Sequence, residues 1–229
     1  MERTSVISPF GNKIFEPFTP ENTTILMVDY NIGFLNIARS HDPTVHMKAA
    51  TALLKIALGF NTGLVFNLGK GQTPYPELAK ALGDHPILYR GSELNAFDSP
   101  KVVDAVKKIG RSHLAVAGLT TEGCVGRTAM SALRSGYTVT LIVDATAGET
   151  LEAHQVALQR LVQAGVVPYT WGSLLDEFQG SWENAKTAQQ YFNIRGEASP
   201  EQGFYFKLLA EKANASDPTP AERGGIKGQ

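Results

Sequence analysis

Three residues with reactive side chains come directly after apolar segments that have the pattern of buried strands. Asp29 ends the segment TTILMVD, Arg90 ends PILYR, and Cys124 follows SHLAVAG after the short connection LTTEG. In a parallel sheet, ligands gather at the carboxyl ends of the strands. An acid, a cation and a thiol that share this edge could serve as base, charge-balancing group and nucleophile.

Cys124 comes at the start of a helix expected at 123–135. The first turn of a helix offers unpaired N–H groups and the positive end of the helix dipole. Both favour the thiolate, so the position predicts a lowered pKa for Cys124. The same N–H groups could bind the oxyanion that forms when a thiolate attacks a carbonyl. The alternative is a small buried residue with no chemical role, because free cysteine is among the most buried residue types.

Asp29 and Arg90 are predicted to form a pair. Asp29 directly follows ILMV, so it should lie near the interior, where a carboxylate needs a partner. The guanidinium of Arg90 could be that partner, and because it keeps its charge it is not a proton donor during turnover. The alternatives are a loop-capping role for Asp29 and a surface ion pair or a contact with Glu93 for Arg90.

Apolar strand patterns alternate with helical patterns through most of the chain. This order predicts an α/β fold with a mostly parallel six-stranded sheet, because strands covered on both faces are continuously apolar. Strands are expected at 23–29, 62–67, 86–90, 112–118, 137–143 and 166–171, and helices at 44–60, 76–82, 100–109, 123–135 and 150–164.

The regular pattern is flanked by segments of different character. Residues 1–22 are expected to be an irregular lead-in, and residues 23–182 the catalytic domain. Residues 183–212 are predicted to form a helical arm, and the Gly- and Pro-rich residues 213–229 a flexible tail. Large apolar side chains over residues 173–212 predict that this stretch is buried, in part against neighbouring subunits of a homo-oligomer.

Composition excludes several classes of protein. The 229 residues include 21 basic and 22 acidic ones, with no segregation into a basic patch, so nucleic acid is not an expected partner. No apolar run is long enough to span a membrane, and the first residues lack the apolar core of a secretory signal. One cysteine excludes internal disulfides. A cytoplasmic protein with a small-molecule substrate is the simplest expectation.

Other motifs of cofactor and metal chemistry are missing. The five histidines show no ligand-like spacing, and the glycines fit neither a dinucleotide-binding fingerprint nor a phosphate-binding loop. No G-x-S-x-G sequence marks a serine nucleophile. We therefore expect no metal and no cofactor. Asn95 and Phe97 are candidates for lining a substrate pocket.

The segments LMVDYNIGF, GLTTEGCVGRTAMSALRSGYTVTLIVDAT and HQVALQRLVQAG resemble the isochorismatase-like cysteine hydrolases over about residues 22–180. The resemblance implies a Rossmann-like three-layer sandwich and a catalytic triad of Asp, Lys and Cys acting on small amides or carbamoyl compounds. Asp29 matches the base and Cys124 the nucleophile. The resemblance also implies a cis peptide bond between Thr120 and Thr121, with the backbone N–H groups of Thr121 and Cys124 forming the oxyanion hole.

One departure from the family pattern is informative. Arg90 stands at the lysine position, and ILYRGSELNAFDSP resembles the YcaC-like subgroup, in which arginine is usual and octamers form. The metal ligands of the nicotinamidase branch are missing from FNLGKGQTPYPE, which argues against a zinc enzyme. Isochorismatases proper lack the cysteine, which argues against vinyl-ether hydrolysis.

The sequence thus favours a metal-independent cysteine hydrolase. One alternative is a catalytically weak oligomeric protein of the same fold that binds ligands or senses oxidants through Cys124. The other is a nucleotide-binding α/β protein, which the missing glycine fingerprint disfavours.

Overall fold

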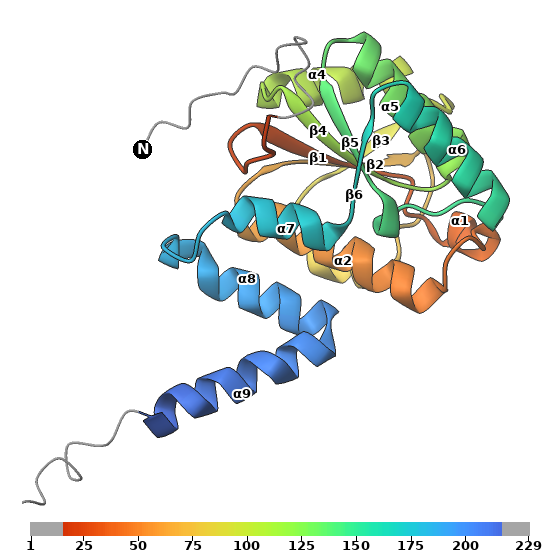
Figure 1. The fold of residues 1–229 in the computed structure, drawn as a ribbon. Helices are drawn as coiled ribbons and strands as arrows, with labels where there is room; N and C mark the ends of the chain where they lie inside the picture. The colour runs from red at the N-terminus through yellow and green to blue at the C-terminus, as the bar shows by residue number, and fades with distance from the viewer. Residues whose placement is uncertain (1–15, 217–229) are drawn as a thin grey trace, which may run out of the picture.

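A six-stranded, all-parallel sheet forms the centre of the protein (Figure 1). The computed structural model of the chain describes residues 16–216, so parts of the predicted lead-in and tail, 1–15 and 217–229, lie outside the described residues. The strand order is β3-β2-β1-β4-β5-β6. The strands are β1 (Thr23–Val28), β2 (Gly63–Gly69), β3 (Ile87–Arg90), β4 (His113–Gly118), β5 (Thr138–Ile142) and β6 (Val167–Tyr169). The predicted α/β class and the six strands are confirmed.

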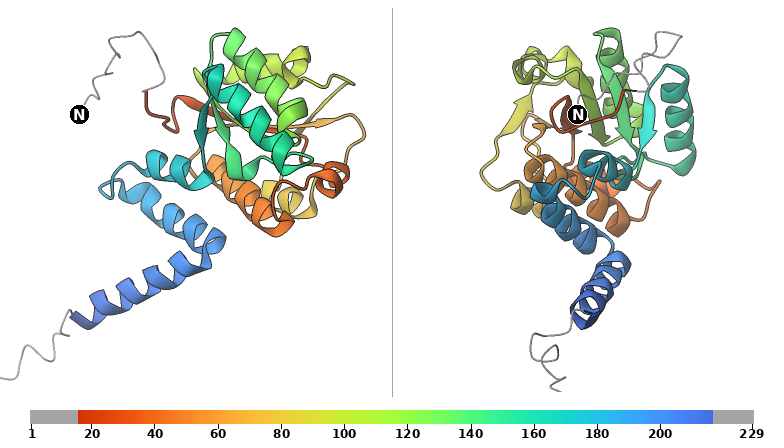
Figure 2. Two further views of the ribbon diagram at one scale, coloured as in Figure 1. Left: turned by 45° about the vertical axis from the view of Figure 1, so that its right-hand side comes forward. Right: turned by 60° about the vertical axis from the view of Figure 1, so that its left-hand side comes forward.

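Helices cover both faces of the sheet (Figures 1 and 2). One layer contains α2 (Pro43–Gly59), α3 (Pro76–Leu82), α7 (Trp171–Gln179) and the inner face of α8 (Ala185–Ala198). The other contains α4 (Pro100–Ile109), α5 (Gly126–Arg134) and α6 (Leu151–Gln163). A short helix, α1 (Ile32–Ile37), follows β1. The result is the three-layer sandwich that the resemblance implies.

Strand β1 shows why its sequence is apolar at every position. Ile25 and Met27 pack into the core shared with α2, whereas Leu26 and Val28 pack into the core shared with α4 and α5. All four side chains are fully buried. A strand covered on both faces needs apolar residues without alternation, which is the pattern in the sequence.

The order of connections reverses between β1 and β4. From β1 the strands run through β2 to β3 at one edge of the sheet, and from β4 they run through β5 to β6 at the opposite edge. The backbones of β1 and β4 lie very close together where the two strands end. A Cβ added to Gly118 would lie only 1.9 Å from the carbonyl oxygen of Val28, so the position has no room for a side chain. Gly118 also has a φ of 147°, which only glycine adopts readily. Sites in doubly wound sheets form at such a reversal, at the carboxyl ends of the strands.

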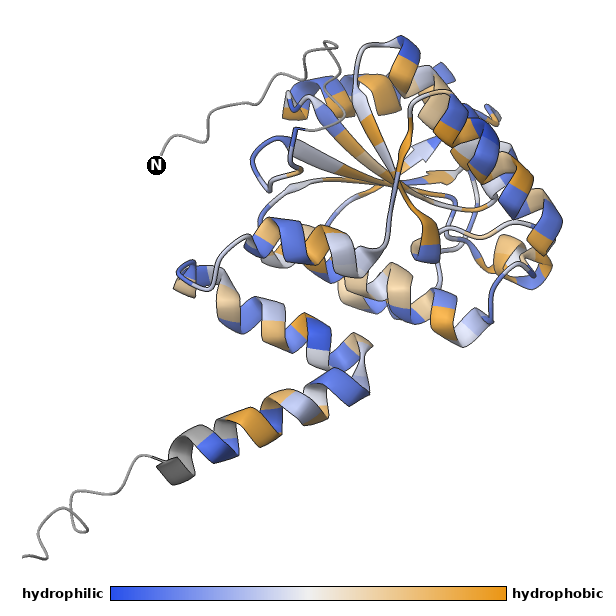
Figure 3. Ribbon diagram, in the orientation of Figure 1, coloured by the Kyte–Doolittle hydropathy of each residue, from blue (hydrophilic) through white to orange (hydrophobic). Residues whose placement is uncertain are grey.

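The C-terminal arm leaves the body of the molecule. The last helix, α9 (Pro200–Ser216), packs against α8 and extends away from the sheet (Figures 1 and 2). It continues beyond residue 212, where the sequence pattern ended the arm. Its aromatic residues Phe204 and Tyr205 are 64% and 56% exposed. Hydrophobic positions, orange in Figure 3, recur along this last helix. Coverage of this surface by neighbouring subunits stays a prediction.

Within the described part of the chain, no helix combines the length and the apolar character that crossing a membrane requires.

Candidate active site

Asp29 lies at the carboxyl end of β1, at the point where the sheet reverses its order. Its side chain is fully buried, and its backbone adopts a φ of 58°, which is uncommon for a residue other than glycine. The Asp29 N–H donates to the carbonyl of Asn67 on β2 at 2.9 Å. This conformation turns the chain sharply out of the strand and holds the carboxylate at the edge of the sheet.

Arg90 ends β3 and reaches across β2 to Asp29. Its Nη1 and Nη2 donate to the two carboxylate oxygens of Asp29 at 2.7 and 2.5 Å. Nη1 also donates to Oδ1 of Asn67 at 2.8 Å, and Nε donates to the carbonyl of Glu93 at 2.8 Å. Arg90 is 4% exposed. Arg90 therefore forms the predicted pair with Asp29. It also contacts Glu93, the alternative partner, but through the backbone carbonyl of Glu93.

Asn67 is a member of this network that the sequence analysis missed. It is fully buried in β2, two residues before the strand ends, and its Nδ2 donates to the carbonyl of Leu88 at 2.9 Å while its Oδ1 accepts from Arg90. The signal was available, because Asn67 ends the predicted strand TGLVFN as Asp29 ends TTILMVD. A polar residue at the end of a buried strand marks the functional edge of the sheet.

Cys124 lies in a π-helical turn, Thr121–Val125, that precedes α5. Cys124 is 5% exposed. The carbonyl of Cys124 accepts a hydrogen bond from Oγ1 of Thr128 at 2.7 Å, which ties the turn to α5. A Cβ on Gly126 would lie 2.5 Å from the carbonyl oxygen of Thr121, so the turn is tightly wound beside the cysteine.

The predicted lowering of the Cys124 pKa is wrong. Burial, the charge of Asp29 and hydrogen bonding to Asp29 raise the pKa of Cys124 to about 12. Arg90 and the N–H of Cys124 itself act in the opposite direction but are outweighed. At neutral pH the thiol is therefore protonated, and it interacts with the Asp29 carboxylate, which can accept its proton. Burial alone would lower the pKa of Arg90. The hydrogen bonds to Asp29 and the negative charge of Asp29 outweigh burial, so the pKa of Arg90 is raised and its guanidinium stays charged.

Two backbone details differ from those implied by the resemblance. The cis peptide bond joins Leu119 and Thr120, not Thr120 and Thr121. Leu119 still donates to the carbonyl of Val28 at 3.1 Å as β1 and β4 end, so the chain leaves the sheet directly after it. The N–H of Thr121 donates to the carbonyl of Ala147 at 3.0 Å and is not free to bind an oxyanion. Within residues 16–216, no hydrogen bond occupies the N–H of Thr120.

The two candidate pocket residues lie in different surroundings. Asn95 is buried and donates from Nδ2 to Oδ1 of Asp98 and Oγ of Ser131, and it lines a cavity beside α5. Phe97 is partly buried: it packs edge-to-face against Tyr137, with ring centroids 6.0 Å apart, and against the core between the sheet and α4–α6. Only Asn95 therefore faces a cavity here.

Three histidines with no regular spacing in the sequence come together behind the cysteine turn. The rings of His41 and His154 lie 4.8 Å apart, and those of His41 and His46 lie 6.3 Å apart. Nδ1 of His154 is hydrogen-bonded to Oγ1 of Thr121 at 2.7 Å. Burial lowers the pKa of His46 and of His154 to about 4, and neighbouring His41 adds to both shifts. Of the residues the structure describes, no group of three or more His, Cys, Asp or Glu is arranged to hold a metal ion.

The isochorismatase domain family model matches residues 23–173, which include the whole sheet and the three predicted catalytic residues. The chain belongs to the isochorismatase family. It is a hydrolase of this family, and its relatives place it in the YcaC-like group.

The chain is 32% identical to the probable hydrolase YcaC of Escherichia coli over 71% of this chain and 80% of that protein. The structure of YcaC from Pseudomonas aeruginosa, which contains hexane-2,5-diol and covalent acrylamide, matches with a TM-score of 0.81 and 26% identity over 86% of this chain and 98% of that one. The Escherichia coli YcaC structure, an octameric hydrolase of unknown specificity, matches with the same TM-score and identity over 90% and 100%.

Proposed function

We propose that the protein is a metal-independent cysteine hydrolase that acts on a small amide or carbamoyl compound. The observation that carries this proposal is the position of the protonated Cys124 thiol beside a carboxylate, Asp29, whose two oxygens are held by Arg90. A base fixed next to a thiol is what a cysteine needs when its own pKa is too high to supply thiolate.

The first half of the reaction forms a covalent intermediate. The Asp29 carboxylate takes the proton from Sγ of Cys124 as the sulfur attacks the carbonyl carbon of the substrate. A C–S bond forms, and the carbonyl electron pair moves to oxygen. The tetrahedral intermediate then collapses, the C–N bond breaks, and Asp29 returns the proton to the leaving nitrogen. Ammonia or an amine departs, and a thioester remains on Cys124.

The second half regenerates the enzyme. Asp29 takes a proton from a water molecule, whose oxygen attacks the thioester carbon. Collapse of the second tetrahedral intermediate breaks the C–S bond, and the proton held by Asp29 returns to Sγ. Arg90 stays protonated throughout and keeps the two Asp29 oxygens in place, so one carboxyl group serves as base and acid in both halves.

The oxyanion in each half would be bound by backbone N–H groups. We assign the N–H groups of Thr120 and Cys124, because the N–H of Thr121 is used by Ala147. The effect of the Cys124 N–H on its own thiol supports its placement near the reacting atoms. Two donors aimed at a developing negative charge are a large part of acyl-transfer catalysis.

We also propose that the chain forms a homo-oligomer, as the octameric Escherichia coli YcaC does. The exposed apolar residues of α9 and Trp182, which is 61% exposed, support this proposal. A reducing cytoplasm would keep Cys124 in the thiol form that the mechanism requires.

The alternative role, an oxidant sensor, finds less support. Oxidation requires thiolate character and access, and Cys124 is buried with a raised pKa. The covalent acrylamide in the Pseudomonas aeruginosa YcaC structure shows that a relative reacts with an electrophile. Such reactivity is expected of a nucleophile that attacks carbonyl compounds.

The test is a screen of the purified protein against small primary amides, ureas and carbamoyl compounds, with ammonia release as the readout. Cys124→Ala is the blank, and Cys124→Ser is the matched variant that keeps a hydroxyl in place of the thiol. We expect hydrolysis by the wild type and essentially none by either variant, because an Asp is a weak base for a serine hydroxyl. Turnover by Cys124→Ser at the wild-type rate would exclude the covalent mechanism.

A further inference from the structure

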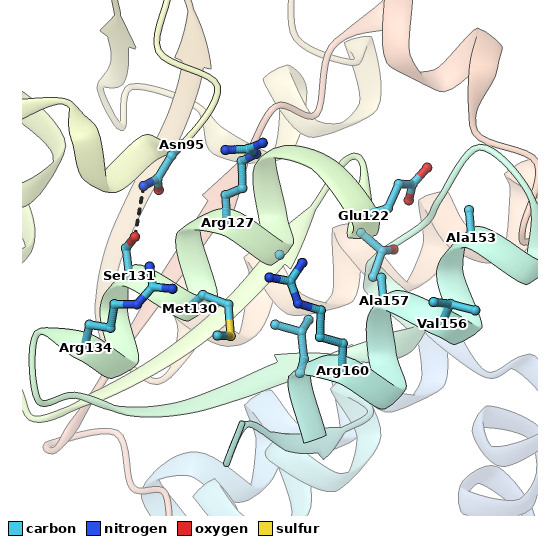
Figure 4. A pocket seen from close by; sticks show the side chains of 13 residues that line it. Asn95, Glu122, Arg127, Met130, Ser131, Arg134, Ala153, Val156, Ala157 and Arg160 are labelled. Atoms are coloured by element: carbon cyan, nitrogen blue, oxygen red, sulfur yellow. Dashed lines mark hydrogen bonds between the residues drawn. The ribbon is translucent and has the colours of Figure 1, made fainter. Parts of the chain in front are cut away.

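A surface cavity of about 410 Å³ lies between α5 and α6, and Asp29, Arg90 and Cys124 do not line it (Figure 4). Arg127 and Arg134 of α5 and Arg160 of α6 contribute the charged part of its lining, and Figure 4 shows Arg160 reaching from α6 toward α5. Apolar side chains complete the lining, including Met130, Val156 and Leu161. The cavity therefore combines cationic side chains with an apolar surface.

The three arginines of this cavity differ from the other arginines of the described chain. Arg39, Arg90, Arg111 and Arg195 each donate hydrogen bonds to carbonyl, hydroxyl or carboxylate oxygens. Among residues 16–216, no side-chain hydrogen bond or ion pair is formed by any of the cavity arginines, Arg127, Arg134 and Arg160. All the unpaired guanidinium groups of the described chain thus line one cavity.

The acidic residue in the lining does not neutralise this charge. Glu122 lines the cavity, but its Oε1 accepts the N–H of Glu149 at 2.9 Å and it forms no ion pair with a described residue. Like charges that gather without partners repel one another, and an anion relieves the repulsion. A guanidinium fork suits carboxylate, sulfonate and phosphate groups, which bind it through two parallel hydrogen bonds.

We propose that this cavity is a binding site for a small organic anion that has an apolar body. The anionic group would lie among Arg127, Arg134 and Arg160, and the body would cover Met130 and Leu161. The hydroxyl of Ser131, also in the lining, is a further donor. The cavity borders the cysteine turn through Thr121 and Gly126, but none of the three proposed catalytic side chains lines it, and binding there does not depend on the proposed hydrolysis.

The probe for this site is anilinonaphthalene sulfonate, an apolar anion whose fluorescence rises on binding. The full-length protein is titrated at low and high salt. We expect saturable binding that weakens as salt is added, because salt screens the arginine charges. Arg134→Gln and Arg160→Gln should each weaken binding about tenfold, the effect of losing one charge-assisted hydrogen bond. Lys101→Gln, which removes an exposed cation of α4 outside the cavity, is the matched control and should bind as the wild type does.

Two outcomes would overturn the proposal. Unchanged binding in both arginine variants would place the probe elsewhere, for example on the exposed apolar residues of α9. A fall in the assembled mass of the Arg134→Gln/Arg160→Gln double variant, measured by light scattering, would make the cavity a contact between subunits. Cys124→Ala should bind the probe as the wild type does, so a failed hydrolase assay and a failed binding assay remain separate results.

Discussion

Arg90 binds both carboxylate oxygens of Asp29, and the two side chains are almost completely excluded from solvent. The pair connects the ends of β1 and β3 across β2, where Asn67 accepts from the same guanidinium. A fork of two parallel hydrogen bonds fixes both the position and the orientation of the carboxylate. In the proposed mechanism this orientation directs one oxygen of Asp29 toward the thiol.

The first prediction separates the geometry of Arg90 from its charge. Removing one partner of a buried ion pair costs about 3–5 kcal/mol, and less where water reaches the site, so Arg90→Ala should lower the free energy of unfolding substantially. Arg90→Lys keeps a charge but loses the fork, so it should keep the fold and part of the activity. Urea unfolding and kcat/KM measure the two effects. Equal activity of Arg90→Lys and the wild type would show that charge alone suffices.

The second prediction concerns the thiol. Asp29→Asn removes a charge that raises the pKa of Cys124, whereas Arg90, which lowers it, remains. The pKa of the thiol should therefore fall, and alkylation by iodoacetamide at about pH 8 should become faster than in the wild type. Hydrolysis should be lost, because no base remains.

Asn67→Asp serves as the control for this variant, since it changes a neighbouring residue of the same network and adds a negative charge. Alkylation of the control should not become faster than that of the wild type. Slower alkylation of Asp29→Asn than of the wild type would contradict the idea that Asp29 holds the thiol in its protonated form. Circular dichroism checks that both variants are folded.

The edge of the sheet that carries the site could be predicted from the sequence, because each of Asp29, Arg90 and Asn67 ends an apolar segment. Parallel strands bring such residues to one side whatever the details of packing. The pKa of Cys124 could not be predicted from its place before a helix. It depends on burial and on Asp29, which is distant in the sequence and adjacent only after β1 and β4 pair.

The histidine cluster and the cavity arginines also escaped the sequence analysis. His46 and His154 come from different helices, α2 and α6, and their contacts with His41 depend on how those helices pack. Arg127, Arg134 and Arg160 look like ordinary surface residues of two amphipathic helices. Their lack of partners becomes visible only when the hydrogen bonds of the folded chain are assigned.

The third prediction tests the close approach of β1 and β4. In Gly118→Ala, the new Cβ would lie 1.9 Å from the carbonyl oxygen of Val28, and the φ of 147° would be strained as well. Gly136→Ala is the control, because its φ is 87° but a Cβ there would meet nothing within 4 Å. The control should lose about 1 kcal/mol of unfolding free energy, and Gly118→Ala clearly more. Similar losses in urea unfolding would show that the strands can separate to admit the methyl group.

The last prediction follows from the buried histidines. The pKa of His46 is about 4 in the folded protein and near the model-peptide value of 6.5 in the unfolded chain, and His154 behaves similarly. Between these values the unfolded state binds more protons, so the free energy of unfolding should fall as the pH decreases from about 6.5 to about 4. Replacing one of these histidines with a residue that does not titrate should reduce that dependence.

His46→Leu is the variant for this test, because the side chain of His46 is 2% exposed and stacks on Tyr30. His85→Leu, at a half-buried position with no ring contact to another histidine, is the control. Urea unfolding of the three proteins between about pH 7.5 and about pH 4.5 gives the slopes. We expect a shallower slope for His46→Leu than for the other two. Parallel slopes for all three would mean that His46 does not resist protonation in the folded state, and that the acid sensitivity arises elsewhere, for example at His154, whose pKa is also lowered by burial.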